Sequence, residues 1–305
     1  MTAEIAILNK SAVALAADSA VTIQVGSGQK IYNTVNKLFT LSKYQPVGIM
    51  VYGNGEFMGV PWESIIKAHR RELAKTEHGT LREYVDGFIA WLSAAKLLFP
   101  ETLQTQIADY IAHNYLAQLK AQIEQQAAAA LAAAKPLDGD RVTQIVRDLI
   151  KTEKEQRLAI PRLPTIQADF EEAFAAKHAQ AIENARANVF QQLPMDASDI
   201  EALPQLVASL FSRDFFGPGA SGVVIAGFGR DEAFPSLVHC SFESLIDGSL
   251  KWKELEASTI DPITNYATIM PFAQREMVDT FLSGIDPIYK ATILQALEQV
   301  LRTIG

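Results

Sequence analysis

The first fifty residues alternate between short apolar runs and polar or glycine-containing breaks, which is the pattern of β-strands. The apolar runs cover residues 5–8, 12–17, 37–41 and 47–52. Gly26 and Gly28 lie between the second and third runs and mark the tip of a hairpin. The pattern predicts an antiparallel β module for this part of the chain.

Residues from about 61 to 211 show the apolar spacing of amphipathic helices. The predicted helices cover residues 61–75, 81–98, 101–134, 140–158, 166–192 and 199–211. Strand patterns return at 221–229, at 236–242 and around Trp252, and the helical patterns 272–282 and 287–302 close the chain. Strands, helices, strands and helices in this order predict the α+β class rather than alternating β and α units.

The change of pattern also predicts the domains. Residues 1–58 and 215–305 would form one core domain, and residues 59–214 a helical insertion within it. The chain has 305 residues, of which 49% are hydrophobic and 20% charged, so it is long and apolar enough to bury a core.

Charge and cysteine content narrow the environment. The formal net charge is −8, so the chain lacks the basic surface that nucleic acid or an anionic membrane attracts, and neither is expected as a partner. Cys240 is the single cysteine and cannot form an intramolecular disulfide, which fits a reducing cytoplasm. The apolar run 12–17 is too short for a secretory signal, and Glu4 precedes it, so a cytoplasmic location is expected.

Several common catalytic motifs do not occur. The five histidines are scattered, without the spacing of a zinc site, so no metal is expected. The glycines around residues 26–30 and 53–59 match neither a phosphate-binding loop nor a dinucleotide fingerprint, so no cofactor is expected. The glycines around Ser221 do not have the spacing of a serine-hydrolase elbow.

Thr2 is the most informative candidate. Removal of the initiator methionine would leave Thr2 with a free α-amine beside its own hydroxyl. An α-amine has a pKa of about 7.7–8.0, so a useful fraction is neutral near pH 7 and can accept the hydroxyl proton. Thr2 would then be both nucleophile and base, which is the N-terminal threonine form of an activated nucleophile.

The residues that follow resemble the proteasome β-subunit family, including its bacterial relatives, within the N-terminal nucleophile (Ntn) hydrolases. The matching stretches are Thr2, the phrase Ala16-Ala17-Asp18 with Thr22, Lys37 with Leu38 and Phe39, and residues 48–53. The resemblance covers about the first 58 residues well and residues 225–242 more loosely. It implies an Ntn-hydrolase-like αββα sandwich that carries a large all-helical insertion.

The resemblance also implies roles for these residues. Thr2 attacks the substrate, and Lys37, held by Asp18, lowers the pKa of the Thr2 hydroxyl. Lys30 is a second candidate for this lysine. The Gly53 N–H stabilises the oxyanion, and Thr22 lies on a strand edge along which an extended peptide pairs. The chain departs from the family pattern at Ala20, where a basic residue is usual, and at Ala267 and Thr268, where a glycine- and serine-containing phrase is usual.

The function predicted in this way is that of a threonine-type peptidase or amidase acting on a peptide or protein substrate. Relatives assemble into rings, so a homo-oligomer is expected from the resemblance. An ATPase partner is left open by the sequence. The alternative is a non-catalytic, proteasome-like scaffold or interaction protein whose helical insertion binds a partner.

Overall fold

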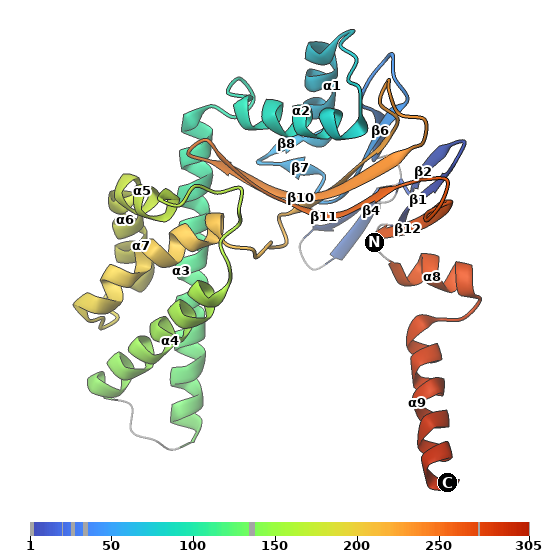
Figure 1. Cartoon of the computed structure of the whole chain (residues 1–305). Coiled ribbons are helices and arrows are strands. Elements are labelled where there is room, and N and C mark those ends of the chain that lie inside the picture. Colours follow the sequence, from blue (N-terminus) through green and yellow to red (C-terminus); the bar gives the residue numbers. More distant parts are fainter. Residues whose placement is uncertain are drawn as a thin grey trace. The chain divides into compact units, whose positions relative to one another are not determined.

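Strands from both ends of the chain meet in two antiparallel sheets (Figure 1). The structure is a computed structural model that describes residues 3–19, 21–25, 28–32, 36–133, 138–273 and 275–304. The strands are β1 Ala3–Asn9, β2 Val13–Ala17, β3 Val21–Val25, β4 Gly28–Tyr32, β5 Leu38–Thr40, β6 Val47–Gly53, β7 Glu56–Phe57, β8 Val60–Pro61, β9 Ser221–Gly227, β10 Ser236–Ile246, β11 Ser249–Thr259 and β12 Ala267–Ala273. The helices are α1 Trp62–Leu73, α2 Leu81–Ala94, α3 Glu101–Ala132, α4 Gly139–Ala159, α5 Phe170–Lys177, α6 Ala179–Phe190, α7 Ala197–Ser212, α8 Arg275–Ser283 and α9 Pro287–Ile304.

The smaller of the two sheets has the strand order β12-β1-β2, and the larger has the order β11-β10-β9-β6-β5. In the smaller sheet Ala3 pairs with Ala273 and Glu4 pairs with Phe272, so strands that are about 270 residues apart in sequence are direct neighbours. In the larger sheet Gly53, the last residue of β6, pairs with Ser221 at the start of β9. The pairs β3–β4 and β7–β8 are separate two-stranded ribbons.

The two sheets enclose an apolar core. Ala6 and Leu8 of β1 pack in one buried cluster with Met50 of β6 and Val224 of β9. Strand β1 shows the reason, because its even-numbered residues are buried and its odd-numbered ones are partly or fully exposed. The strand therefore presents one face to the space between the sheets.

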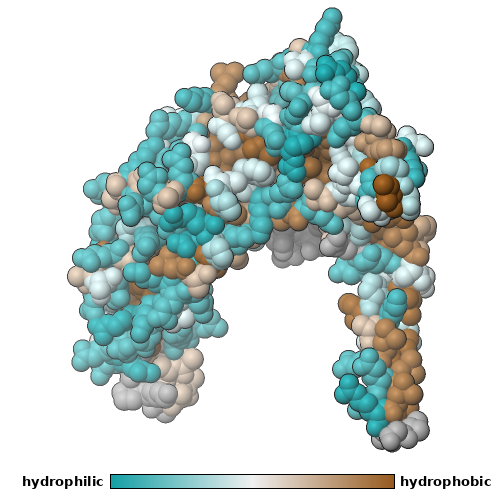
Figure 2. All heavy atoms as spheres, in the orientation of Figure 1, coloured by the Kyte–Doolittle hydropathy of each residue, from teal (hydrophilic) through white to brown (hydrophobic). Residues whose placement is uncertain are grey.

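Helices cover the sheets. In Figure 1, α1 and α2 lie along the face of the larger sheet that points away from the smaller one. Trp62 of α1 is buried and donates a hydrogen bond from Nε1 to the Ser221 hydroxyl at 2.8 Å. Helix α8 contacts β1 and β12. Helix α9 follows, and several of its apolar side chains are exposed, Leu297 and Leu301 among them. Figure 2 shows brown, hydrophobic atoms along this helix.

The chain divides into two compact units. The first contains residues 1–91, 218–241 and 254–305, and the second contains residues 92–217 and 242–253. The predicted domain boundaries at residues 58 and 215 differ from this division, because α1 and most of α2 belong to the first unit. The composition of a helix does not show which core it packs against.

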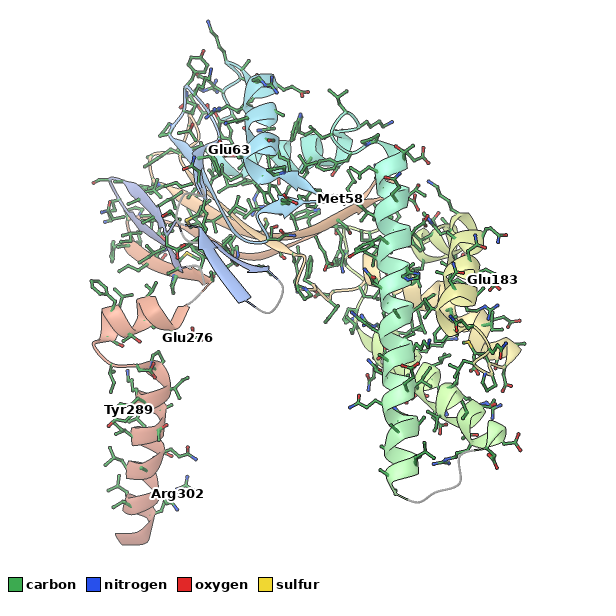
Figure 3. The ribbon with its side chains drawn as sticks, turned by 180° about the vertical axis from the view of Figure 1, so that it is seen from behind. Met58, Glu63, Glu183, Glu276, Tyr289 and Arg302 are labelled. Carbon is green, nitrogen blue, oxygen red and sulfur yellow. The ribbon has the colours of Figure 1, made fainter. Side chains whose placement is uncertain are left out.

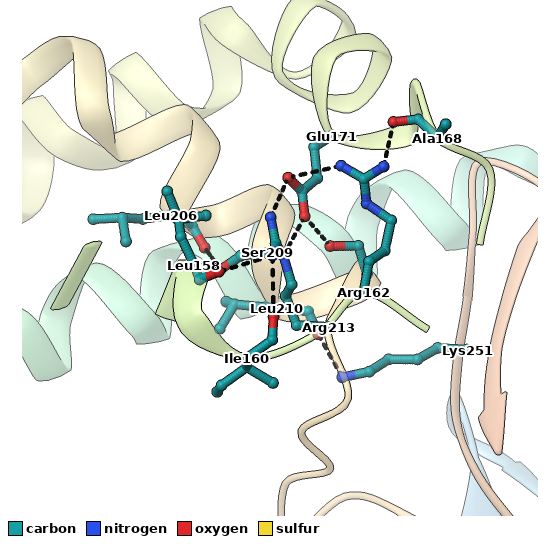
Figure 4. Close-up of polar contacts among 11 residues, drawn as sticks. Leu158, Ile160, Arg162, Ala168, Glu171, Leu206, Ser209, Leu210, Arg213 and Lys251 are labelled. Carbon is teal, nitrogen blue, oxygen red and sulfur yellow. Dashed lines mark hydrogen bonds and ion pairs between the residues drawn. The ribbon is translucent and has the colours of Figure 1, made fainter. Parts of the chain in front are cut away.

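Arg213 organises the polar interior of the second unit (Figure 4). Its guanidinium donates to both carboxylate oxygens of Glu171, at 2.7 and 3.0 Å, and to the backbone carbonyls of Leu158 and Ile160. The Ser212 hydroxyl donates to the same carboxylate. Burial alone would raise the pKa of Glu171, but the hydrogen bonds from Arg213 and Ser212 outweigh it and hold that pKa below its ordinary value.

The mixed architecture with antiparallel sheets agrees with the predicted α+β class. The predicted helices and most of the predicted strands are confirmed, with one difference in the helical block. The pattern at 166–192 is two helices, α5 and α6, separated at His178. A one-residue break leaves the apolar periodicity nearly unchanged, so the sequence pattern does not show it. The pattern also missed β12, which runs from Ala267 to Ala273.

Candidate functional site

Asp18 and Lys37 form an ion pair in the first unit. The Lys37 Nζ atom lies 2.5 Å from the Asp18 Oδ1 atom, and 7% of the lysine side chain is exposed. Asp18 directly follows β2, and Lys37 directly precedes β5, so the two sheets place these residues together. A buried ammonium group is costly without a counter-charge, and the Asp18 carboxylate supplies that counter-charge.

The ion pair lies beside the beginning of β1. The Asp18 N–H donates to the Ala3 carbonyl at 3.1 Å, and the Val51 N–H of β6 donates to the Lys37 carbonyl at 2.9 Å. Thr2, the predicted nucleophile, lies outside the described residues. Ala3 directly follows the predicted nucleophile in the chain. Its carbonyl accepts the hydrogen bond from the Asp18 N–H.

Glu4 adds a second carboxyl group to this region. The side chain points between the sheets, is 1% exposed, and has no hydrogen-bond partner for either oxygen among the described residues. Burial raises the pKa of Glu4 to about 8; the charge of Lys37 opposes that shift and the charge of Asp18 adds to it. At neutral pH the Glu4 carboxyl is therefore mostly protonated, and it sits within the electrostatic reach of the ion pair.

A hydroxyl–imidazole pair lies on the side of the smaller sheet to which the Glu4 side chain points. The Tyr52 hydroxyl is 2.7 Å from the His239 Nε2 atom. The ring of Phe272, which is the partner of Glu4 in the β1–β12 ladder, stacks on Tyr52 and meets His239 edge-on, with centroids 6.4 and 4.9 Å away. Three strands, β6, β10 and β12, supply these rings.

These rings form one wall of a cavity of about 290 Å³. Its lining consists of Tyr52, His239, Leu255, Glu256, Phe272 and Ala273. Ala273 has a φ of +59°, a left-handed conformation that costs energy for a residue with a side chain. Because Ala273 also pairs with Ala3, the cavity opens next to the beginning of β1.

Gly53 ends β6 with a φ of +79°, and a Cβ atom at this position would lie 3.0 Å from the Ala220 carbonyl oxygen. Both observations favour glycine here. Gly53 lies two positions after Val51, whose N–H donates to the Lys37 carbonyl, so the predicted oxyanion donor ends β6 and the predicted lysine directly precedes the neighbouring strand β5.

The remaining predicted residues are less informative. Thr22 is on β3 and Lys30 is on β4, and these strands pair with each other. The side chains of both residues lie outside the described part of the structure. Within that part, no group of three His, Cys, Asp or Glu side chains is placed to hold a metal ion, and no helix has the length and apolar character of a membrane span.

Ala267 and Thr268, which stand where the family has its glycine- and serine-containing phrase, do not directly precede a helix. They begin β12 and pair with Asn9 and Leu8 at the end of β1 that is remote from Thr2. The position directly before α8 that the structure describes is Ala273, six residues further on.

Sequence reasoning missed Glu4, Tyr52, His239 and Glu256. A signal for Glu4 is present, because the alternation in β1 places it on the same face as Ala6 and Leu8, where a carboxylate is unusual. The other three have no local signal, because they come together only through the register of β6, β10 and β11.

Comparisons with models of protein families, with curated proteins and with solved structures find no match for this chain.

Proposed function

We propose that this protein is a threonine-type N-terminal nucleophile hydrolase, a peptidase or amidase with an αββα core. The observation that carries the proposal is the Asp18–Lys37 ion pair. The Asp18 N–H also donates a hydrogen bond to the carbonyl of Ala3, the residue that follows Thr2. The two stacked sheets with helices α1, α2 and α8 against them support the same fold, and the resemblance of the first 58 residues supports the same family.

In the proposed reaction, the Thr2 hydroxyl oxygen attacks the carbonyl carbon of an amide and its proton passes to the free α-amine. Lys37 stabilises the developing alkoxide, and the Gly53 N–H stabilises the oxyanion of the tetrahedral intermediate. The amide C–N bond then breaks, the leaving amine takes the proton, and an ester to Thr2 remains. Water, activated by the same α-amine, hydrolyses this ester and restores Thr2.

The experiment is intact-mass spectrometry before and after incubation with a peptidyl β-lactone, which acylates a nucleophilic oxygen as its ring opens. The expected protein lacks Met1 and gains one lactone at Thr2. Thr2→Ser should keep the adduct, and Thr2→Ala should lose it. Retention of Met1, or equal labelling of Thr2→Ala, would remove the proposal.

The rate of β-lactone labelling of Lys37→Met provides a second test, and Lys30→Met is its matched control. We expect the labelling rate of Lys37→Met to fall by about a hundredfold or more, because the alkoxide loses its stabilising charge. The Lys30→Met variant should label at close to the wild-type rate. The opposite result would assign the role to Lys30.

The second candidate is a non-catalytic scaffold, and the second unit favours it. Residues 92–217 and 242–253 form a compact unit with its own buried network around Arg213. A helical unit of this size is larger than the proposed reaction requires. A protein that keeps its fold but never labels at Thr2 would support this function.

A further inference from the structure

The smaller sheet has an apolar face on the side opposite the core. Along β1 the residues of this face alternate with the buried Ala6 and Leu8, and they pair with residues of β2 and β12. This outer face consists of Ile5 and Ile7 of β1, Ala14 and Ala16 of β2, and Ile269 and Pro271 of β12. An antiparallel sheet that meets water on one side ordinarily carries polar residues there, so an apolar outer face indicates that another element covers it.

The described part of the chain leaves the middle of this face open. Ile7 and Ile269 are opposite each other in the β1–β12 ladder, and they are 41% and 45% exposed. Ala14, the partner of Ile7 on β2, is exposed as well. Helix α8 contacts β1 and β12 but does not bury this row of residues.

Helix α9 carries a second exposed apolar face in the same unit. Its apolar residues recur at spacings of three and four, which places them on one side of the helix. This α9 face consists of Ile293, Leu294, Leu297, Val300 and Leu301, and all five side chains are exposed. In Figure 3 it lies between the labelled residues Tyr289 and Arg302. A helix of 18 residues is marginal in water by itself, so this face also requires a cover.

The two faces match in size and chemistry. Helix α9 has 18 residues and extends about 27 Å, and the seven residues of β1 extend about 24 Å. Neither face includes a charged residue. Lys290, one turn before Leu294, is long enough to keep its ammonium group in water at the border of a contact. Packing of an apolar helix face on an apolar sheet face is the usual way in which a layered domain buries both.

A second copy of the chain is the partner that satisfies both faces. In one chain both are exposed at once, so α9 does not cover the sheet of its own chain. Each copy has one α9 face and one outer sheet face. When two copies exchange their helices about a two-fold axis, each sheet receives the helix of the other copy and neither face stays open. A different protein that covers one of the faces would leave the other exposed.

The connection between α8 and α9 favours exchange between copies. Only residues 284–286 separate the two helices, and α8 itself contacts the sheet. A connection this short restricts how far α9 can turn back over its own sheet, and short connections favour the exchange of an element between copies.

We propose that α9 of one copy packs on the outer face of the smaller sheet of a second copy, and that the second copy returns the same contact. The contact involves neither Thr2 nor the Asp18–Lys37 pair, so it does not depend on the proposed function. It assigns a specific surface to the self-assembly that the resemblance predicts.

Cysteine cross-linking of the full-length protein tests the exchange. Cys240 is the single native cysteine, so Cys240→Ala provides a background without thiols. In this background, chains with Ile7→Cys and chains with Leu297→Cys are co-expressed and treated with a short bismaleimide. We expect a cross-linked dimer in the co-expressed sample and little in either variant alone, because the contact joins Ile7 of one copy to Leu297 of the other.

Gln295→Cys is the matched control for Leu297→Cys. Gln295 is exposed and lies two residues before Leu297, so it is on another side of the helix. We expect it to cross-link to Ile7→Cys at least about tenfold less. Thermal melting checks that each variant is folded.

Three results would overturn the inference. Dimers formed by Leu297→Cys alone would show that α9 pairs with α9. A cross-link within one chain that carries both Ile7→Cys and Leu297→Cys would show that α9 covers its own sheet. Equal cross-linking by Gln295→Cys, or none by either helix position, would show that the two faces make no specific contact.

Leu297→Glu in the otherwise native chain provides an independent measurement. We expect sedimentation equilibrium to show self-association weakened by about a hundredfold or more, because the exchange would bury a carboxylate among apolar side chains. Gln295→Glu adds the same charge on another side of the helix and should associate as the wild type does. Unchanged association of a folded Leu297→Glu variant would also contradict the proposed contact.

Discussion

Glu4 differs from an ordinary surface carboxylate because the strand that carries it points it between two sheets. Its oxygens have no hydrogen-bond partner among the described residues, so the charged form loses the solvation that water provides. Glu4 pairs with Ala17, the neighbour of Asp18, across β1 and β2, and with Phe272 across β1 and β12. The backbone of this one residue therefore lies between the segment that carries Asp18 and the segment that carries Phe272.

The raised pKa of Glu4 predicts a pH-dependent stability. The unfolded chain loses the proton near the ordinary value of 4.5, whereas the folded protein keeps it until about 8. Between these values unfolding releases a proton, so a rise in pH favours the unfolded state. Glu4→Gln removes this fall in stability with rising pH. The difference between the free energies of unfolding of Glu4→Gln and wild type should therefore increase by on the order of 1 kcal/mol per pH unit between about pH 5 and pH 8.

Urea denaturation of both proteins at pH 5, 6, 7 and 8 measures this difference. A constant offset between the two stability curves across that range would contradict the assignment. At pH 5 both carboxyl and amide are neutral, so the two proteins should then have similar stability.

At the scale of elements, Arg213 joins three segments of the second unit. It follows α7, binds Glu171 of α5, and satisfies the carbonyls of Leu158 and Ile160 at the end of α4. These carbonyls belong to a helix end, where the helix itself provides no donors. The Arg213 guanidinium therefore both joins α7 to α5 and donates hydrogen bonds to the carbonyls at the end of α4 (Figure 4).

Arg213→Met should lower the free energy of unfolding by about 3 kcal/mol, because it leaves a buried carboxylate and two carbonyls without their donor. Arg186→Met is the matched control. Arg186 pairs with Glu183 on the surface of α6, and 47% of the glutamate side chain is exposed. That variant should change the stability by less than about 1 kcal/mol. Equal effects in urea denaturation would show that the Arg213 network is not a major source of stability.

At the scale of the whole molecule, the resemblance predicts self-assembly. We expect light scattering to give a mass that is a multiple of the 33.4 kDa chain. The exposed apolar side chains of α9 agree with this expectation, because an amphipathic helix of this length is marginal in water without a partner. A mass of one chain at all concentrations measured would contradict it.

Local patterns were sufficient for most of the elements. The period of apolar residues predicted α1 and α2 because each helix buries one side against a neighbour. Gly26 and Gly28 correctly indicated the β3–β4 hairpin, in which Val25 pairs with Gly28. The resemblance implied that Asp18 holds Lys37, and the structure brings these two side chains together. These inferences succeed because each depends on neighbours in sequence or on one family phrase.

The sequence by itself therefore determined most of the helices and strands and the α+β class, whereas the residues of a threonine nucleophile site stay a prediction from the resemblance. Only the tertiary structure decided that Glu4 is buried and that Tyr52, His239, Glu256 and Phe272 surround one cavity. The physical reason is sheet register. A ladder that pairs residue 4 with residue 272 sets which side chains meet, and no local periodicity encodes that alignment.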